Sequence, residues 1–168
     1  MPPTPARARF SIERTYAAPI EDTWRLWTTR AGIEAWWGPE GFAVTVVSLD
    51  LKPGGQLVYL MTATAPEQVA FMKQAGMPLS TEARVTYTEV EAPRRLGYRT
   101  LTDFIPGVEP YDVATLVELH PVADGVKMIL SFDAMHDEVW TGRMREGHEG
   151  QLRKLDALLA ARGQGVRL

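Results

Sequence analysis

The stretch His136–Arg162, HDEVWTGRMREGHEGQLRKLDALLAAR, decides how the rest of this 168-residue chain folds. Asp137 and Glu138 lie at its start, where the helix dipole favours acidic residues, and Gly163 follows it as a helix stop. His148 falls on the apolar stripe of this helix, so we expect its imidazole to face whatever the helix covers. The stripe itself recurs at spacings of three, four and eight residues, and consists of Trp140, Met144, Leu152, Leu155, Leu158 and Leu159.

Composition indicates a single domain and excludes several classes of protein. The chain has 18 basic and 21 acidic residues, a formal charge of −3 and no cysteine. Without cysteine there are no disulfides, thiolate metal sites or cysteine nucleophiles, and a reducing, cytoplasmic location is expected. Basic residues are scattered among acidic ones, so no nucleic-acid partner is expected. No apolar run reaches the ~18 residues of a membrane span.

Alternating polar and apolar residues predict seven strands, which are interrupted along the chain by two short helices and one insertion. One helix begins at Pro19 and another covers residues 30–36, both directly after the first strand. Residues 65–80 interrupt the strand pattern with one or two helical turns, which could form a lid over a cavity or a decorated loop. The strands are predicted at residues 7–16, 43–51, 56–64, 82–90, 95–103, 111–120 and 126–133.

Short turns between consecutive strands predict an antiparallel meander. The concave face of a curved sheet must be covered, and the last helix is the segment long and apolar enough to cover it. We therefore predict an α+β fold in which a curved seven-stranded antiparallel sheet wraps a long C-terminal helix. This domain should span residues 7–162, between a flexible tail at 1–6 and a C-terminal tail at 163–168.

A cavity between sheet and helix is predicted to hold a small molecule. His148 could act there as a general acid or base, hydrogen-bond a ligand, or be a core histidine satisfied by a neighbour. Arg14 interrupts the apolar face of the first strand and could pair with a ligand carboxylate, or with Glu89 or another strand acid. The remaining candidate ligand-binding residues are aromatic, soft or hydroxyl-bearing: Trp37, Tyr59, Met61, Tyr87, Tyr98, Thr100, Thr115, Trp140 and Met144.

No metal site or cofactor is expected from the sequence. His136 and His148 are too far apart to share an ion, since they would lie about 18 Å apart along one helix. A Gly-x-Ser-x-Gly nucleophile motif does not occur.

In the strand predicted at residues 43–51, alternation places Val47, Leu49 and Leu51 on a common face.

Several short motifs, in this order, are shared with one known family. They are Ala17-Ala18-Pro19 before Trp24, Trp36-Trp37-Gly38-Pro39, Leu49–Gly55, Thr88–Leu96, and Glu146-Gly147 before Leu152 and Leu155. With them the chain resembles the START-like, or SRPBCC, superfamily with its helix-grip fold. Within this superfamily the chain is most similar to the activator of heat-shock-protein-ninety ATPase homologue family, whose bacterial members are often labelled polyketide-cyclase-like. Two departures concern the cavity: the family commonly has Gly-Trp where this chain has Gly147-His148, and a short loop in place of residues 65–80.

The resemblance implies the fold more strongly than the function, and three functions are open. The leading one is binding of a lipid-like or aromatic molecule, because the predicted cavity is rich in aromatics and lacks a pre-arranged catalytic pair. The second is a cyclase, dehydratase or hydrolase with His148 as its acid–base group. The third and least favoured is a co-chaperone-like ATPase activator, because the chain is too short for the separate N-terminal domain of the eukaryotic activators. A curved sheet also allows a homodimer, although no exposed apolar stripe in the sequence favours one.

Overall fold

The computed structural model describes residues 9–38, 40–103, 105 and 107–163. The predicted tail at 1–6, and residues 164–168 of the predicted C-terminal tail, lie outside the described residues. The elements are β1 (Arg9–Tyr16), α1 (Ile20–Thr28), α2 (Arg30–Trp36), β2 (Phe42–Leu49), β3 (Gln56–Ala63), α3 (Pro66–Gln74), β4 (Ser80–Glu91), β5 (Arg95–Thr102), β6 (Tyr111–Val122), β7 (Gly125–Asp133) and α4 (Glu138–Gly163).

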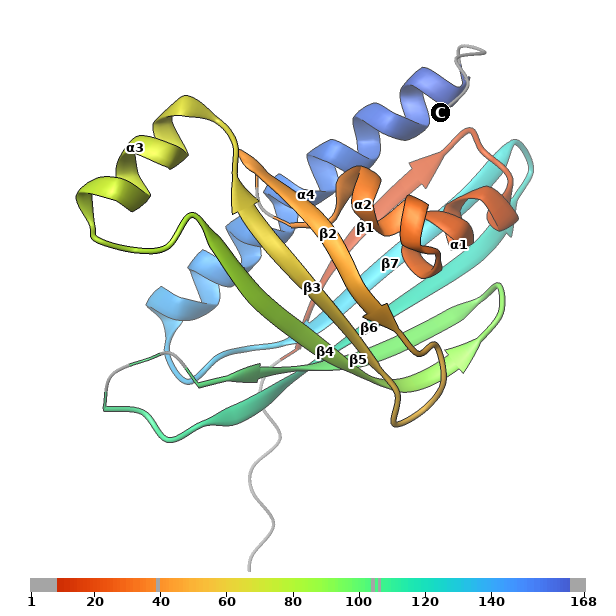
Figure 1. Ribbon diagram of the computed structural model, residues 1–168. Helices are drawn as coiled ribbons and strands as arrows, with labels where there is room; N and C mark the ends of the chain where they lie inside the picture. Colours follow the sequence, from red (N-terminus) through yellow and green to blue (C-terminus); the bar gives the residue numbers. More distant parts are fainter. Residues whose placement is uncertain (1–8, 39, 104, 106, 164–168) are drawn as a thin grey trace, which may run out of the picture.

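The seven strands form one antiparallel sheet in the order β1-β7-β6-β5-β4-β3-β2. β1 and β2 therefore occupy opposite edges, and the chain between them, which contains α1 and α2, connects one edge to the other (Figure 1). The sheet curves around the long helix α4 (Figure 1). The predicted α+β helix-grip fold, with two short helices after the first strand, is confirmed.

The long helix begins two residues later than predicted, because Asp137 caps it from outside. The Asp137 carboxylate accepts a hydrogen bond of 2.8 Å from the backbone N–H of Trp140, three residues on, as an N-cap does. The Thr141 hydroxyl donates to the Asp137 carbonyl at 2.6 Å and accepts from the Met135 N–H at 2.9 Å. These bonds fix the entry of the helix and the orientation of the segment that precedes it.

The C-terminal half of α4, residues 150–161, covers a filled core. Leu152, Leu155 and Leu159 are buried there, as the predicted stripe requires. Their partners in the same core cluster include Met128 and Leu130 of β7, which are also fully buried. Burial of a leucine contributes about 1.5–3 kcal/mol, so this half of the helix contributes much of the fold's stability.

Aromatic side chains fill the space between the two short helices and the middle of the sheet. Trp27, Trp36 and Trp37 pack edge to face, with ring centroids 4.6–5.6 Å apart. The indole of Trp37 continues this packing onto Tyr59 at 6.2 Å and Tyr98 at 5.9 Å. Such geometry suits the ring quadrupoles and adds to simple area burial.

One predicted strand face is wrong. We expected Val47, Leu49 and Leu51 to share a face, but Val47 is 49% exposed whereas Leu49 and Leu51 pack against the core. The physical reason is an irregularity in the β2–β3 register between Val46 and Ser48. An extra residue there reverses the alternation of side chains.

Residues 65–80 contain the predicted helical insertion as α3, which connects β3 to β4 (Figure 1). Within this helix Met72 is buried, whereas Phe71 is 62% exposed. The helix projects at the end of the hairpin (Figure 1). Its role as a lid stays a prediction.

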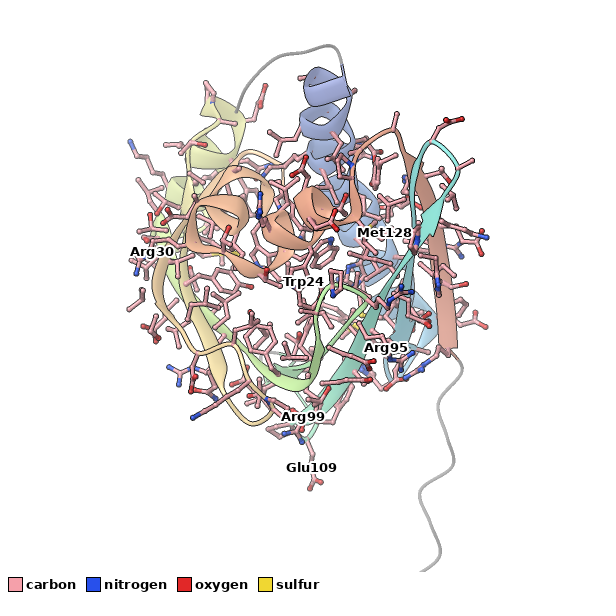
Figure 2. The ribbon with its side chains drawn as sticks, turned by 90° about the vertical axis from the view of Figure 1, so that its right-hand side faces the viewer. Trp24, Arg30, Arg95, Arg99, Glu109 and Met128 are labelled. Carbon is pink, nitrogen blue, oxygen red and sulfur yellow. The ribbon has the colours of Figure 1, made fainter. Side chains whose placement is uncertain are left out.

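The convex face of the sheet is polar. Arg95 of β5 pairs with Glu89 at 2.7 Å and with Glu118 at 3.1 Å across neighbouring strands. Figure 2 shows Arg95 and Arg99 on the outside of the curved sheet. A space for a ligand is therefore expected on the concave side of the sheet, beneath α4.

Candidate functional site

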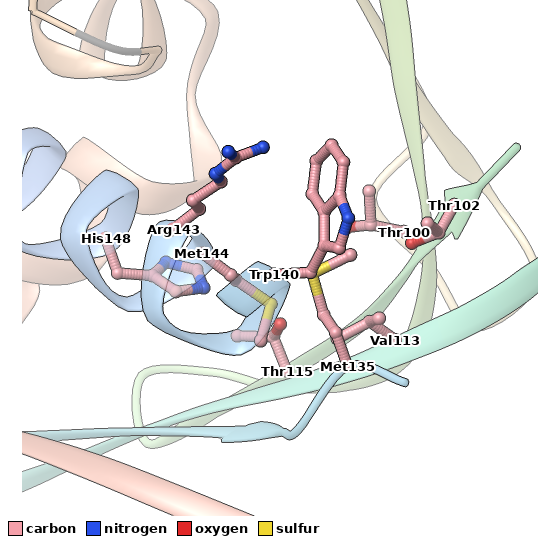
Figure 3. Close-up of a pocket in the computed structure, with 9 residues that line it drawn as sticks. All are labelled: Thr100, Thr102, Val113, Thr115, Met135, Trp140, Arg143, Met144 and His148. Carbon is pink, nitrogen blue, oxygen red and sulfur yellow. The ribbon is translucent and has the colours of Figure 1, made fainter. Parts of the chain in front are cut away.

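A pocket of about 330 Å³ lies between the N-terminal half of α4, residues 138–149, and strands β5 and β6 (Figure 3). Two adjacent strands form its floor, and successive turns of one helix form its wall. Its lining consists of Thr100, Thr102, Val113, Thr115, Met135, Trp140, Arg143, Met144 and His148.

Local periodicity explains why these residues meet. Trp140, Met144 and His148 recur every four residues and so lie on one face of α4. On the floor, Thr100 is paired in register with Val113, and the side chains two residues away on each strand point the same way. The two strands thus present a continuous surface of threonine and valine to the helix.

The pocket is apolar with few polar groups, the usual character of a small-molecule site. Thr102, Val113 and Thr115 are buried at the floor, while Trp140 and Met144 are half-buried on the helix side. Arg143 is exposed and marks the open end. An entering ligand would meet indole, thioether and methyl groups together with threonine hydroxyls.

His148 lies within this pocket without a hydrogen-bond partner among the described residues. Its ring packs 4.6 Å from the ring of Phe132, a fully buried residue of β7. Burial lowers the pKa of His148 to about 4, although the carboxylate of Glu149 acts in the opposite direction. At neutral pH the imidazole is therefore uncharged, and offers one donor and one acceptor to a ligand.

Arg143 stacks on Trp140 at the open end of the pocket. Its guanidinium carbon lies 4.8 Å from the centre of the Trp140 ring, and Figure 3 shows the two side chains next to each other. Within the described part of the chain Arg143 has no ion pair. The stacking limits the freedom of an otherwise flexible cation.

Five of the predicted site residues line the pocket: Thr100, Thr115, Trp140, Met144 and His148. Trp37, Tyr59 and Tyr98 pack instead in the aromatic cluster described above, and Tyr87 and Met61 also lie outside the pocket lining. Burial raises the pKa of the Tyr98 hydroxyl, so this phenol stays protonated. Tyr98 is paired in register with Thr115, which lines the pocket floor, so Tyr98 borders the pocket without lining it.

Arg14 lies outside the pocket and is held by two carboxylates of α4. Its guanidinium is 2.6 Å from Glu149 and 3.3 Å from Asp156. The Tyr16 hydroxyl donates to the other oxygen of Asp156 at 2.7 Å. Glu89, an alternative partner considered for Arg14, pairs with Arg95 instead. These contacts tie the edge strand β1 to the helix.

Four lining residues were not predicted: Thr102, Val113, Met135 and Arg143. Thr102 and Val113 each lie two residues from a predicted site residue, so strand alternation could have found them. Arg143 lies three residues after Trp140, a spacing at which helical side chains touch. Met135 belongs to the segment before α4, and no sequence signal identifies it.

A hydrogen bond holds the segment that carries Met135. The Tyr111 hydroxyl at the start of β6 is 2.7 Å from Nδ1 of His136 and accepts from the His136 backbone N–H at 3.1 Å. This contact joins the beginning of β6 to the entry of α4. Across the described ranges, no cluster of histidine and acidic residues has the arrangement of a metal site.

The fold defines a START-like helix-grip protein, in which a curved sheet and a C-terminal helix have a pocket between them. The chain belongs to the family of activator of Hsp90 ATPase homolog 1-like proteins, whose sequence profile matches residues 17–160. Proteins with this family fold commonly bind hydrophobic ligands. A comparison with curated proteins gave no match.

Solved structures of bacterial relatives share the fold. Protein CV1439 from Chromobacterium violaceum is similar at 22% identity with a TM-score of 0.72, over 90% of this chain and 96% of that one. The AHSA1 protein from Silicibacter pomeroyi has 23% identity and a TM-score of 0.70, over 92% of this chain and 99% of its own. An AHSA1-like protein from Aeromonas hydrophila gives 23% identity and a TM-score of 0.70, over 93% and 94%. In the described part of the chain, no helix is long and apolar enough to cross a membrane.

Proposed function

We propose that this protein binds a small, largely apolar molecule in the pocket between α4 and strands β5 and β6. The observation that carries the proposal is an apolar pocket that contains an uncharged imidazole, His148, with no hydrogen-bond partner in the described residues. His148 is half-buried, and a ligand that hydrogen-bonds to it would use a donor or acceptor that no described residue engages.

The size of the pocket limits the ligand. A volume of about 330 Å³ is at the lower end of small-molecule sites, which span roughly 300–1,000 Å³. At about 30 Å³ per non-hydrogen atom, the share of one water molecule in liquid water, the enclosed part of the ligand has about ten such atoms. A bicyclic aromatic ring system or a medium-length acyl chain meets this requirement.

The indole of Trp140 provides a direct readout of binding. We expect 2-naphthol to shift the Trp140 Nε1–H signal in a ¹H–¹⁵N spectrum, assigned by its loss in Trp140→Phe. The His148→Trp variant should abolish that binding, because the larger side chain projects into the pocket while a tryptophan at this helix position is common in the family. Ala157→Trp, on an exposed site of the same helix, is the matched control and should bind normally. Equal binding by both tryptophan variants would place the ligand elsewhere.

His148 also favours a second candidate, an enzyme that moves a proton on the bound molecule. Because burial lowers its pKa to about 4, the imidazole at neutral pH could accept a proton but has none to give as imidazolium. A base of such low pKa is weak, so only an activated substrate proton would suit it. His148→Gln should then abolish turnover of a bound compound while binding persists; turnover that survives this change would exclude the mechanism.

The cytoplasmic location, homodimer formation and the absence of a chaperone partner stay predictions. The family description names an ATPase activator, and a pull-down with a chaperone ATPase tests whether this chain has that role. We expect no stimulation of the ATPase by the purified protein.

A further inference from the structure

We propose that the ligand is an amphipathic acid, whose apolar body occupies the pocket and whose carboxylate pairs with Arg143 at the open end. This inference rests on the proposed function and adds the chemical class of the ligand to it. It begins from the charge of the lining, in which Arg143 is the one residue ionised at neutral pH. No carboxylate lines the pocket.

Arg143, like Arg30, Arg94 and Arg145, has no acidic partner among the described residues, and of these four it is the one that lines the pocket. Arg14 and Arg95 each contact two carboxylates, and Arg153 pairs with Glu40. An intrahelical partner is available to Arg143 in Glu146, three residues on, but the two do not form an ion pair in the structure. The charge of Arg143 is therefore uncompensated at the pocket entrance.

The position of the guanidinium suits a carboxylate. The guanidinium carbon lies over the Trp140 ring, 4.8 Å from its centroid, and this contact holds the cation next to the pocket (Figure 3). Stacking on an aromatic face leaves the N–H groups at the guanidinium edge available as donors. A carboxylate accepts two of these donors in parallel, which a neutral amide cannot do with equal strength.

The burial gradient fixes the orientation of the ligand. Arg143 is exposed, whereas Thr102, Val113 and Thr115 at the floor are buried. A carboxylate at the floor would lose its hydration without a cation to compensate, which is strongly unfavourable. The acid group therefore stays at the entrance and the hydrocarbon enters first.

Matched ligands test the inference by isothermal titration calorimetry at neutral pH. The probes are 2-naphthoic acid and 2-naphthamide, which share shape and apolar area and differ in charge. We expect the protein to bind the acid about five- to tenfold more tightly than the amide, as suits an ion pair that is partly exposed. Arg143→Gln should remove this preference by weakening the acid alone.

The matched control is Arg145→Gln, which makes the same change of charge two residues further along the helix, outside the pocket lining. This variant should keep the preference for the acid, and added salt should reduce it in the unmodified protein. Equal affinity of the unmodified protein for acid and amide would overturn the inference while leaving the proposed function intact. A preference that persists in Arg143→Gln would overturn it as well. Absence of binding by either compound would instead count against the proposed function itself.

Discussion

The two halves of α4 cover the same sheet but do different work. Residues 150–161 present leucines to the aliphatic side chains of β7 and enclose a filled core. Residues 138–149 present Trp140, Met144 and His148 to a floor of threonine and valine, and enclose a pocket. Two glycines of this half, Gly142 and Gly147, have open space where a side chain would begin. Under the function proposed above, one half of this helix serves stability and the other half serves ligand binding.

The largest expected effect is a loss of stability in the half of α4 that covers the filled core. Leu155→Ala removes a fully buried side chain and should lower the free energy of unfolding by about 2–5 kcal/mol. Met144→Ala, in the half-buried pocket wall, should cost about 1 kcal/mol or less, because a cavity already adjoins it. Urea denaturation of both variants measures the difference. Equal losses would mean that the two halves of α4 contribute alike.

A second test measures how stability depends on pH through His148, in the half of α4 that lines the pocket. The pKa of His148 is about 4 in the folded protein against an ordinary value of 6.5, so the unfolded chain takes up the proton first as the pH falls. The stability contributed by the neutral imidazole is complete above about pH 6.5 and is lost between that value and about pH 4, to the extent of about 3 kcal/mol.

Chemical denaturation of the unmodified protein and of His148→Gln across this range isolates the effect, since the other titrating groups are common to both. The variant should lose less stability on acidification. Parallel pH profiles would show that the imidazole is protonated as easily in the folded protein as in the unfolded chain.

The smallest expected effect concerns the polar contacts between β1 and α4. Tyr16→Phe removes the hydrogen bond to Asp156 and should lower the free energy of unfolding by about 1 kcal/mol. Affinity for 2-naphthol should not change, because Tyr16 lies outside the pocket lining. Thermal denaturation and a titration of the same sample check both statements; a loss of affinity would show that the two halves are coupled.

Helical and strand periodicity predicted the elements of the fold, but not where the sheet and α4 separate. The stripe of α4 and the inward faces of β5 and β6 follow from spacing alone. Tyr98 and Thr100 share one face of β5, yet Tyr98 packs in the aromatic cluster and Thr100 lines the pocket. The curvature of the sheet determines which of these two environments a residue enters, and the alternation of residues in a sequence gives no information on curvature.

Long-range partners were the other limit. Arg14 was recognised as a charge on an inward face, but its acids lie on α4, at the opposite end of the chain. The bulge between Val46 and Ser48 likewise cannot be recognised from the alternation of polar and apolar residues in the sequence. Both features depend on how distant segments fit together in space.

The pairing of the first strand with the last has a consequence for synthesis of the chain. Tyr16 of β1 is opposite Val126 of β7, so β1 can find its place only after β7 has left the ribosome. Helix α4, which covers the concave face, emerges later still. Until β7 and α4 have been synthesised, the partial sheet exposes its apolar side, and we expect this long-range pairing to make folding slow and to increase the need for general folding helpers in that interval.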